Sequence, residues 1–376
     1  MTNSISEHML TLPTVFAIGD KYNIFVPFSC EVIMWVKVGD KTYYDEYNGI
    51  LRSNTNMHKV ELPMSVLDSE KKYTVCYKKA IERKPYFPKF EDEVALTFDF
   101  RPVPISGPIN IYHISDAHNL VDEPVRAGRY FGDKLDLLIL NGDIPNHSGR
   151  IENFNAICEI AAKVTGGSCP TVFVRGNHDT RGIHAEDMPN YIPTLNGKTY
   201  YSFRVGSLWG LAIDCGEDKP DGNAEYGGTI CFHGFRERED EYIHEIVGNA
   251  NKEYNADGVE HRIVISHIPF SYIQPAPFNI EQDIYREWTR VMRDEIKPEL
   301  LLYGHLHQTA IYAPGSDFDS YSLQPCPAIV GSAPILPHSS PDGKTGFTGC
   351  AITLDGDKMT VVFNTDKGEI VSKHEI

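Results

Sequence analysis

The stretch from Val174 to Gly182, VRGNHDTRG, concentrates polar and charged side chains in one short turn. It follows PTVF, an apolar run of buried-strand length, so the turn lies at the carboxyl end of a predicted strand. Four other apolar runs end in similar side chains. In chain order the five segments are Asp116-Ala117-His118, Gly142-Asp143, Gly176-Asn177-His178-Asp179, His267 and Gly304-His305-Leu306-His307. Because ligands of open α/β sheets bind at the carboxyl ends of strands, we expect these segments to form one site.

The residue types of these segments indicate a metal site. They offer carboxylate, amide oxygen and imidazole but no thiolate, which suits hard-to-borderline divalent ions. Residues two apart on an extended strand point the same way, so Asp116 and His118 can reach one ion. His305 and His307 have the same spacing.

The complete set resembles the calcineurin-like metallophosphoesterase superfamily, whose pattern is DxH, GD, GNH(D/E), H and GHxH. The resemblance covers roughly residues 109 to 335 and implies a four-layer α/β/β/α sandwich that hydrolyses phosphate esters. It also implies two divalent ions, and the ligand types do not distinguish Mn, Fe, Zn, Ni or Co. By the same resemblance, one ion is held by Asp116, His118, Asp143 and His307, and the other by Asp143, Asn177, His267 and His305.

The implied chemistry is an in-line displacement at phosphorus. A hydroxide that bridges two ions roughly 3.5–4 Å apart attacks the phosphate ester. His178 is then the general acid for the leaving alkoxide, and Asp179 orients or charge-balances the site. The alternative for His178 is a structural hydrogen bond.

Three further residues are predicted to contact substrate. Arg175 and Arg181 are placed to hold the phosphate, bidentate if their geometry permits, and His147 follows the Gly-Asp segment. The alternatives are a surface salt bridge for each arginine and a solvated loop for His147.

Departures from the patterns of three subfamilies narrow the prediction. Purple acid phosphatases have the patterns DxG and GDxxY. This chain has His118 in place of the glycine of DxG and Asn146 in place of the tyrosine that would bind ferric iron. Phosphoprotein phosphatases have GDxVDRG, whereas this chain has GDIPNHS, so the acid histidine lacks its usual partner. Nucleases that share GNHD usually begin with their catalytic domain. The remaining prediction is an enzyme for a small phosphate mono- or diester.

The elements that would position these residues fall into two regions. Residues 1–105 contain about seven strand-like runs, which predicts a small all-β, immunoglobulin- or fibronectin III-like sandwich domain. Tyr73 is either a tyrosine corner of such a domain or part of a plain strand. The proline-rich segment 101–108 reads as a linker. Residues 106–376 alternate apolar strands with helical stripes, which predicts the α/β phosphoesterase domain.

Composition limits the partners. The chain has 376 residues and a net charge of −17, which disfavours nucleic acid and anionic membranes but not a small phosphate ester. Eight scattered cysteines indicate free thiols in a reducing compartment. We see no signal peptide or membrane span, so we expect a cytoplasmic protein of open oligomeric state.

The alternative function is a catalytically weak binding protein whose β-sandwich recruits a protein or glycan.

Overall fold

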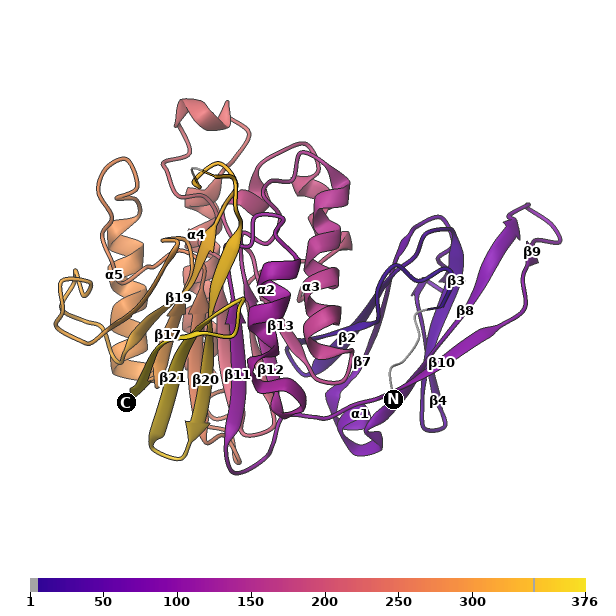
Figure 1. Cartoon of the computed structure of the whole chain (residues 1–376), viewed down its shortest axis with the longest axis horizontal. Coiled ribbons are helices and arrows are strands. Elements are labelled where there is room, and N and C mark those ends of the chain that lie inside the picture. Colours follow the sequence, from indigo (N-terminus) through magenta and orange to yellow (C-terminus); the bar gives the residue numbers. More distant parts are fainter. Residues whose placement is uncertain (1–5, 341) are drawn as a thin grey trace.

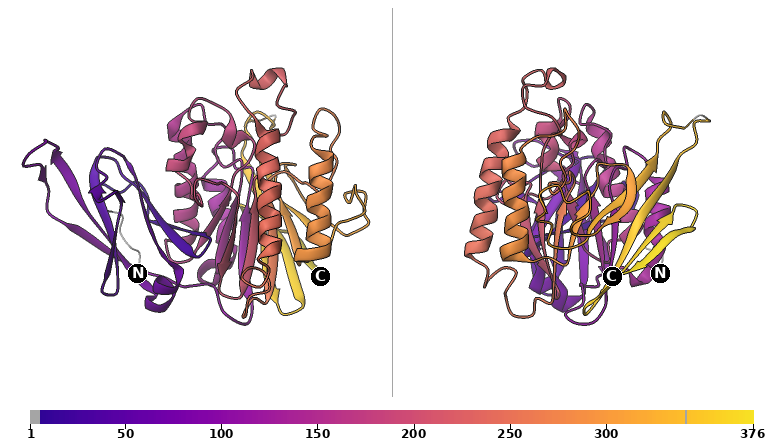
Figure 2. Two further views of the ribbon diagram at one scale, coloured as in Figure 1. Left: turned by 180° about the vertical axis from the view of Figure 1, so that it is seen from behind. Right: turned by 90° about the vertical axis from the view of Figure 1, so that its left-hand side faces the viewer.

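The chain has the predicted mixed α/β fold: the two halves of a large sheet pack against each other through a central core, and helices cover their outer faces (Figures 1 and 2). A computed structural model describes residues 6–340 and 342–376. Residues 1–5, where the predicted β domain begins, lie outside the described residues. None of the described helices is long and apolar enough to cross a membrane. All eight cysteines lie in the described part and carry free thiols.

Six strands run in the same direction, and five of them, all except β15, carry the predicted site. The six are β11 (Ile109–Ile114), β12 (Leu137–Asn141), β13 (Thr171–Val174), β15 (Leu208–Ile213), β16 (His261–Ser266) and β17 (Leu300–Tyr303). β11, β12 and β13 pair in parallel, and so do β15, β16 and β17. β19 (Ala328–Ile335) and β20 (Gly346–Asp355) connect the two groups, because β19 is parallel to β17 and antiparallel to β20, which is antiparallel to β11. All six carboxyl ends therefore meet at one edge.

Side chains alternate between two cores along these strands. Leu137 and Ile139 of β12 lie in a central apolar cluster together with Ile263 and Ile265 of β16. The intervening residues of β12 face an outer cluster against α2 (Asp122–Gly128) and α3 (Asn155–Thr165). On the other side, α4 (Phe232–Gly248) and α5 (Gln282–Val291) cover β15, β16 and β17. Burial on both faces explains why these strands read as continuous apolar runs.

The N-terminal strands extend the central sheet. β1 pairs in parallel with β13, where Phe16 lies opposite Thr171, and β2 and β7 follow β1 in the same sheet. β3, β4, β8 and β10 form a second sheet, in which β9 (Lys89–Phe90) also pairs with β8. The bounds are β1 (Thr14–Ile18), β2 (Lys21–Pro27), β3 (Val32–Val38), β4 (Lys41–Tyr44), β7 (Met57–Pro63), β8 (Lys72–Glu82) and β10 (Val94–Asp99). A separate sandwich domain that ends at residue 105 stays a prediction.

The hydroxyl of Tyr73 ties this region to the rest of the chain. It donates to the carbonyl oxygen of Gly167 at 2.8 Å, beyond the end of α3. Because its partner is 94 residues away, the hydroxyl does not close a local corner. The plain-strand interpretation of Tyr73 therefore describes the structure better than a tyrosine corner.

The other elements complete the sheets and connections. The remaining strands and regular helix are β5 (Glu46–Tyr47), β6 (Ile50–Leu51), α1 (Met64–Glu70), β14 (Tyr201–Val205), β18 (Gln308–Tyr312), β21 (Lys358–Thr365) and β22 (Ile370–Glu375). The short helical turns are η1 (Arg129–Lys134), η2 (Ile151–Phe154), η3 (His178–Thr180), η4 (Ala185–Asn190), η5 (Ala224–Tyr226) and η6 (Met292–Ile296).

Candidate metal centre

The strand ends bring the predicted ligands together in two groups. Ligand atoms of Asp116, His118 and His307 lie within 4.8 Å of one another. Those of Asp143, His267 and His305 form a second group of the same size. Each group draws on strands from both halves of the sheet, so the site depends on the whole fold.

Individual contacts connect the members of each group. Nε2 of His118 lies 3.0 Å from Nε2 of His307. In the other group, Nε2 of His267 lies 3.2 Å from Oδ2 of Asp143. The seventh predicted ligand, Asn177, places its Oδ1 3.0 Å from Nδ1 of His305.

Five of these residues adopt the left-handed backbone region, which non-glycine residues rarely enter. Their φ angles are 57° for Asp116, 46° for His118, 54° for Asp143, 67° for His305 and 49° for His307. Each such conformation costs on the order of 1–3 kcal/mol and clusters at functional sites. The fold therefore holds strained loops where the ligand atoms meet.

The hydrogen bonding of His267 suits a metal ligand. Its Nδ1 lies 2.6 Å from the carbonyl oxygen of Asn141, which fixes the proton on that nitrogen. Its Nε2 is buried and forms no hydrogen bond within the described part of the chain, although Oδ2 of Asp143 lies 3.2 Å away. Nδ1 of His118 is also buried without a hydrogen bond there. Metal-binding histidines commonly donate their other ring nitrogen to a backbone carbonyl in this way. The residues present therefore fit a metal ion.

The electrostatics of the centre favour added positive charge. Asp116 and Asp143 are both buried. Burial alone would lower the pKa of His267, but Asp143 and Asp116 raise it to about 10. By contrast, burial lowers the pKa of His118 and of His305 to about 4, so both are neutral, the form that binds metals.

His178 lies at the rim of the centre, on η3 directly after β13. Its Nδ1 is 2.8 Å from the carbonyl oxygen of Asn146, and its Nε2 is 4.0 Å from Oδ2 of Asp143. The side chain is 31% exposed, unlike the buried carboxylate of Asp143. The ring thus has one nitrogen anchored by the backbone and the other directed at the centre.

Asp179 is buried below the loops rather than in the centre. Its Oδ2 accepts hydrogen bonds from the amides of Gly176 at 2.7 Å and Asp143 at 3.2 Å. Burial, with the nearby Asp143, raises the pKa of Asp179 well above its usual value. The carboxyl group therefore connects the Gly-Asp and Gly-Asn-His-Asp segments through their backbones.

The predicted substrate-binding residues have different surroundings. Arg175 is paired with Asp214 at 2.8 Å and stacks on the rings of Phe232 and Phe235, which favours the salt-bridge interpretation. His147 accepts a hydrogen bond from the amide of Gly149 at 3.0 Å, a contact within its own turn.

Arg181 is the one predicted substrate-binding residue that contacts a candidate catalytic side chain. Its Nη1 lies 3.2 Å from Nε2 of His178. Its Nε and Nη2 form a fork with Glu217 at 2.9 and 2.8 Å, and Nη2 also reaches Asp218 at 3.2 Å.

Glu217 and Asp218 are residues that the sequence analysis missed. They follow β15, which is another apolar strand with polar residues at its carboxyl end, and its run LWGLAIDCGED carries that signal. Arg236 donates to the carbonyl oxygens of Cys215 and Glu217, so α4 fixes the loop. No family pattern marked this strand end, which is why it was overlooked.

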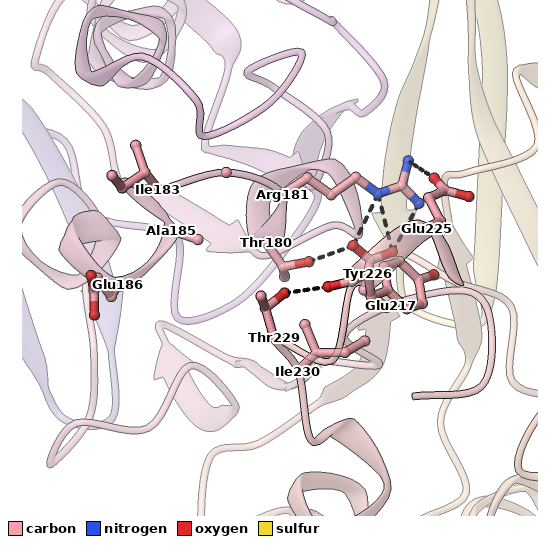
Figure 3. A pocket seen from close by; sticks show the side chains of 11 residues that line it. Thr180, Arg181, Ile183, Ala185, Glu186, Glu217, Glu225, Tyr226, Thr229 and Ile230 are labelled. Atoms are coloured by element: carbon pink, nitrogen blue, oxygen red, sulfur yellow. Dashed lines mark hydrogen bonds and ion pairs between the residues drawn. The ribbon is translucent and has the colours of Figure 1, made fainter. Parts of the chain in front are cut away.

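A cavity of about 590 Å³ opens beside Arg181 (Figure 3). The segment after η3 and the loop after β15 provide its walls. Arg181 and Glu217 are among its lining residues, so it begins one side chain away from His178.

Comparison with known families identifies the class of protein. The model of the calcineurin-like phosphoesterase family matches residues 109–309, more than half of the chain. The chain belongs to this family, as its motifs predicted, and the family assignment supports metal-dependent phosphoester hydrolysis in general. No curated protein matches the sequence.

Solved structures of similar fold include two phosphoesterases. The purple acid phosphatase PPD1 of yellow lupin (Lupinus luteus) seeds is 13% identical with a TM-score of 0.64, covering 97% of this chain and 73% of that one. The structure of PhoD is 12% identical with a TM-score of 0.56, covering 98% of this chain and 93% of that one. At such identities the likeness establishes the fold alone, and it extends over the N-terminal strands.

Proposed function

We propose that this chain hydrolyses a mono- or diester of phosphoric acid with a small alcohol, using two divalent ions. The observation that carries the proposal is the convergence of seven ligand residues, five of them in a strained backbone conformation. One ion would be held by Asp116, His118, Asp143 and His307, and the other by Asp143, Asn177, His267 and His305. Such ions supply a water nucleophile near neutral pH and offset charge on the phosphoryl oxygens.

Asp143 is the proposed bridge between the ions. Its Oδ2 lies 3.2 Å from Nε2 of His267 and 3.9 Å from Nε2 of His118, which belong to different groups. Its Oδ1 accepts a hydrogen bond from the amide of His178 at 2.8 Å. A carboxylate held between the two groups is suited to contact both ions.

His178 is the proposed general acid. Its anchored Nδ1 fixes the ring, and Nε2 accepts from Nη1 of Arg181 in this structure. His178 would act as the acid once Nε2 is protonated and that contact opens, and the Nε2 proton would then pass to the leaving alkoxide. Nη1 of Arg181, beside that Nε2, would stabilise the same oxygen. We assign Asp179 to positioning, because its carboxylate binds backbone amides of the two loops.

The metal identity is a separate proposal. Mn, Fe, Zn, Ni and Co all accept the carboxylate, amide and imidazole ligands of this centre. The likeness to a purple acid phosphatase does not extend to ferric iron, because Asn146 stands where that group has tyrosine.

Hydrolysis of two model esters tests the proposal. We expect the purified protein with added Mn²⁺ to release p-nitrophenol from p-nitrophenyl phosphate, from bis-p-nitrophenyl phosphate, or from both, and EDTA to abolish the release. The preferred ester then separates a phosphatase from a phosphodiesterase. An intact, Mn²⁺-loaded protein that hydrolyses neither ester would refute the proposed function.

A further inference from the structure

The cavity beside Arg181 is positioned to receive the alcohol part of a substrate. Nη1 of Arg181 reaches Nε2 of His178, where the leaving oxygen would be protonated. Arg181, Ile183 and Ile230 are among the residues that line the cavity (Figure 3). An alcohol whose oxygen lies at His178 can therefore continue into this space.

Arg181, which lines this cavity, and Lys219, which binds the lining residue Glu225, are already paired with carboxylates. The guanidinium of Arg181 binds Glu217 in a fork and reaches Glu225 at 3.7 Å. The ammonium of Lys219 lies 2.9 Å from Glu225 and 3.1 Å from Asp218. Both cations are shared among three carboxylates, so neither is free to hold a second phosphate or a carboxylate of the substrate.

Acidic side chains are in excess around the cavity. Glu186 is an exposed fourth carboxylate of this set, for which the described part of the chain offers no ion pair. Figure 3 shows Glu186 and Glu225 on opposite sides of the cavity. Four carboxylates against two cations leave a local charge of −2. The field at the cavity therefore attracts a cation and repels an anion.

The hydroxyl groups of the walls have partners of their own. Thr229 donates to the carbonyl oxygen of Tyr226 at 2.7 Å, and the Tyr226 hydroxyl donates to Asp218 at 2.9 Å. Thr180 donates to Glu217 at 2.8 Å. These donors are used within the protein. Of the carboxylates, Glu186 and Glu225 are exposed toward a ligand, whereas Glu217 is fully buried.

Building on the proposed function, we infer that this cavity selects a phosphate ester whose alcohol carries an ammonium group. The phosphate would lie at the metal centre, and the ammonium group would lie beside Glu225, with Glu186 adding negative charge from the opposite side of the cavity. Esters with a second anionic group, such as a carboxylate, are disfavoured at the same place.

Three esters of similar length test the inference by changing only the charge at the end of the alcohol. They are O-phosphoethanolamine, ethyl phosphate and 2-phosphoglycolate, used as competitors of whichever p-nitrophenyl ester the Mn²⁺-loaded full chain hydrolyses. We expect O-phosphoethanolamine to inhibit at roughly fivefold lower concentration than ethyl phosphate, and 2-phosphoglycolate to be the weakest, as partly exposed ion pairs predict. Ethyl phosphate or 2-phosphoglycolate equal to or better than O-phosphoethanolamine would overturn the inference.

Removal of one carboxylate tests the assigned location. In Glu225→Gln we expect the ratio of the O-phosphoethanolamine and ethyl phosphate inhibition constants to fall to about twofold or less. Glu241→Gln is the matched control, because Glu241 is exposed on α4 and outside the cavity lining. It should retain the wild-type ratio. An unchanged ratio in both Glu225→Gln and Glu186→Gln would contradict the assignment.

The two proposals fail in different ways. If neither p-nitrophenyl ester is hydrolysed, the proposed function fails before the competitors are compared. If hydrolysis depends on metal but the three competitors show no preference for the ammonium group, the function stands and the cavity assignment is wrong.

Discussion

At the scale of single residues, the account depends most on Asp143. Its Oδ2 lies close to histidines of both groups, at 3.2 Å from His267 and 3.9 Å from His118. Asp116 also approaches both groups, through His307 and His267, but it lies in the first group. A glycine precedes Asp143 in its loop, and Asp143 itself adopts a φ of 54°. This backbone conformation orients the Asp143 side chain. A substitution of Asp143 should therefore weaken the binding of both ions, whereas a substitution of His178 at the rim of the centre should not.

The substitution Asp143→Asn should lower the rate by ~100-fold or more and reduce the bound metal, because the amide cannot supply a bridging negative charge. Metal content by mass spectrometry and the rate on the preferred p-nitrophenyl ester measure both effects. Asp99→Asn removes a carboxylate that is 89% exposed and serves as the control. Full metal content in Asp143→Asn would exclude the bridging role.

His178→Ala should separate proton donation from metal binding. We expect metal content to stay at the wild-type level while the rate on alkyl esters falls by ~10²–10⁴-fold. The loss should be smaller on p-nitrophenyl esters, because that leaving group needs little protonation. Loss of metal in this variant would instead indicate that His178 is a metal ligand. Its position in a possible ligand group with His118 and Asp143 is the reason to measure the metal content.

At the scale of elements, the loops after the strands must approach closely for the ligands to converge. A Cβ at Gly142 would lie 2.6 Å from backbone atoms of Gly176 and from Cγ of His267, and its φ is +75°. The Gly-Asp and Gly-Asn-His-Asp segments are therefore in backbone contact, and glycine is required where they meet.

Gly142→Ala should therefore destabilise the protein and lower its metal content. We expect a loss of about 1–3 kcal/mol in the free energy of unfolding, together with loss of most activity. Gly166→Ala is the matched control, because Gly166 at the end of α3 also has positive φ (+63°) but no neighbour within 4 Å of the added atom. It should cost about 1 kcal/mol at most and keep the rate. An active, metal-replete Gly142→Ala would contradict the packing argument.

The strand ends of the site were predictable because apolar runs and ligand residues are contiguous in the sequence. The acidic loop around Glu217 lies at an equivalent strand end, yet no motif distinguishes its carboxylates from solvated ones. The sequence predicted a substrate contact for Arg181, the partner of Glu217. The hydrogen bonds between Arg181 and Glu217 join residues 36 apart in sequence, so they depend on tertiary structure. The same holds for Arg175, whose pairing with Asp214 could not be read from spacing.

At the scale of the whole molecule, three N-terminal strands, β1, β2 and β7, belong to the central sheet. Alternation predicted strands there, but not that β1 would pair with β13. Local pattern specifies a strand, whereas its neighbour is decided by packing between distant segments. Val15 and Ala17 of β1 share the central core with Val172 and Val174 of β13. The region before residue 105 and the phosphoesterase part thus share one core.

A fragment of residues 106–376 should therefore be less stable than the full chain. Removal of β1 exposes the edge of β13 and opens the central core, so we expect the fragment to aggregate or to unfold at least about 10 °C lower. Circular dichroism melting of both proteins measures the difference. A monomeric fragment with the Tm and the rate of the full chain would instead support an independent domain with a boundary at residue 105.

The central claim is that this centre holds two ions that act together in phosphoester hydrolysis. The most direct measurement is a titration of metal-depleted protein with Mn²⁺, in which bound metal and the rate on the preferred p-nitrophenyl ester are followed together. The account predicts that the rate reaches its maximum at two bound ions per chain. Full activity at one bound ion, or activity that persists without metal, would contradict it.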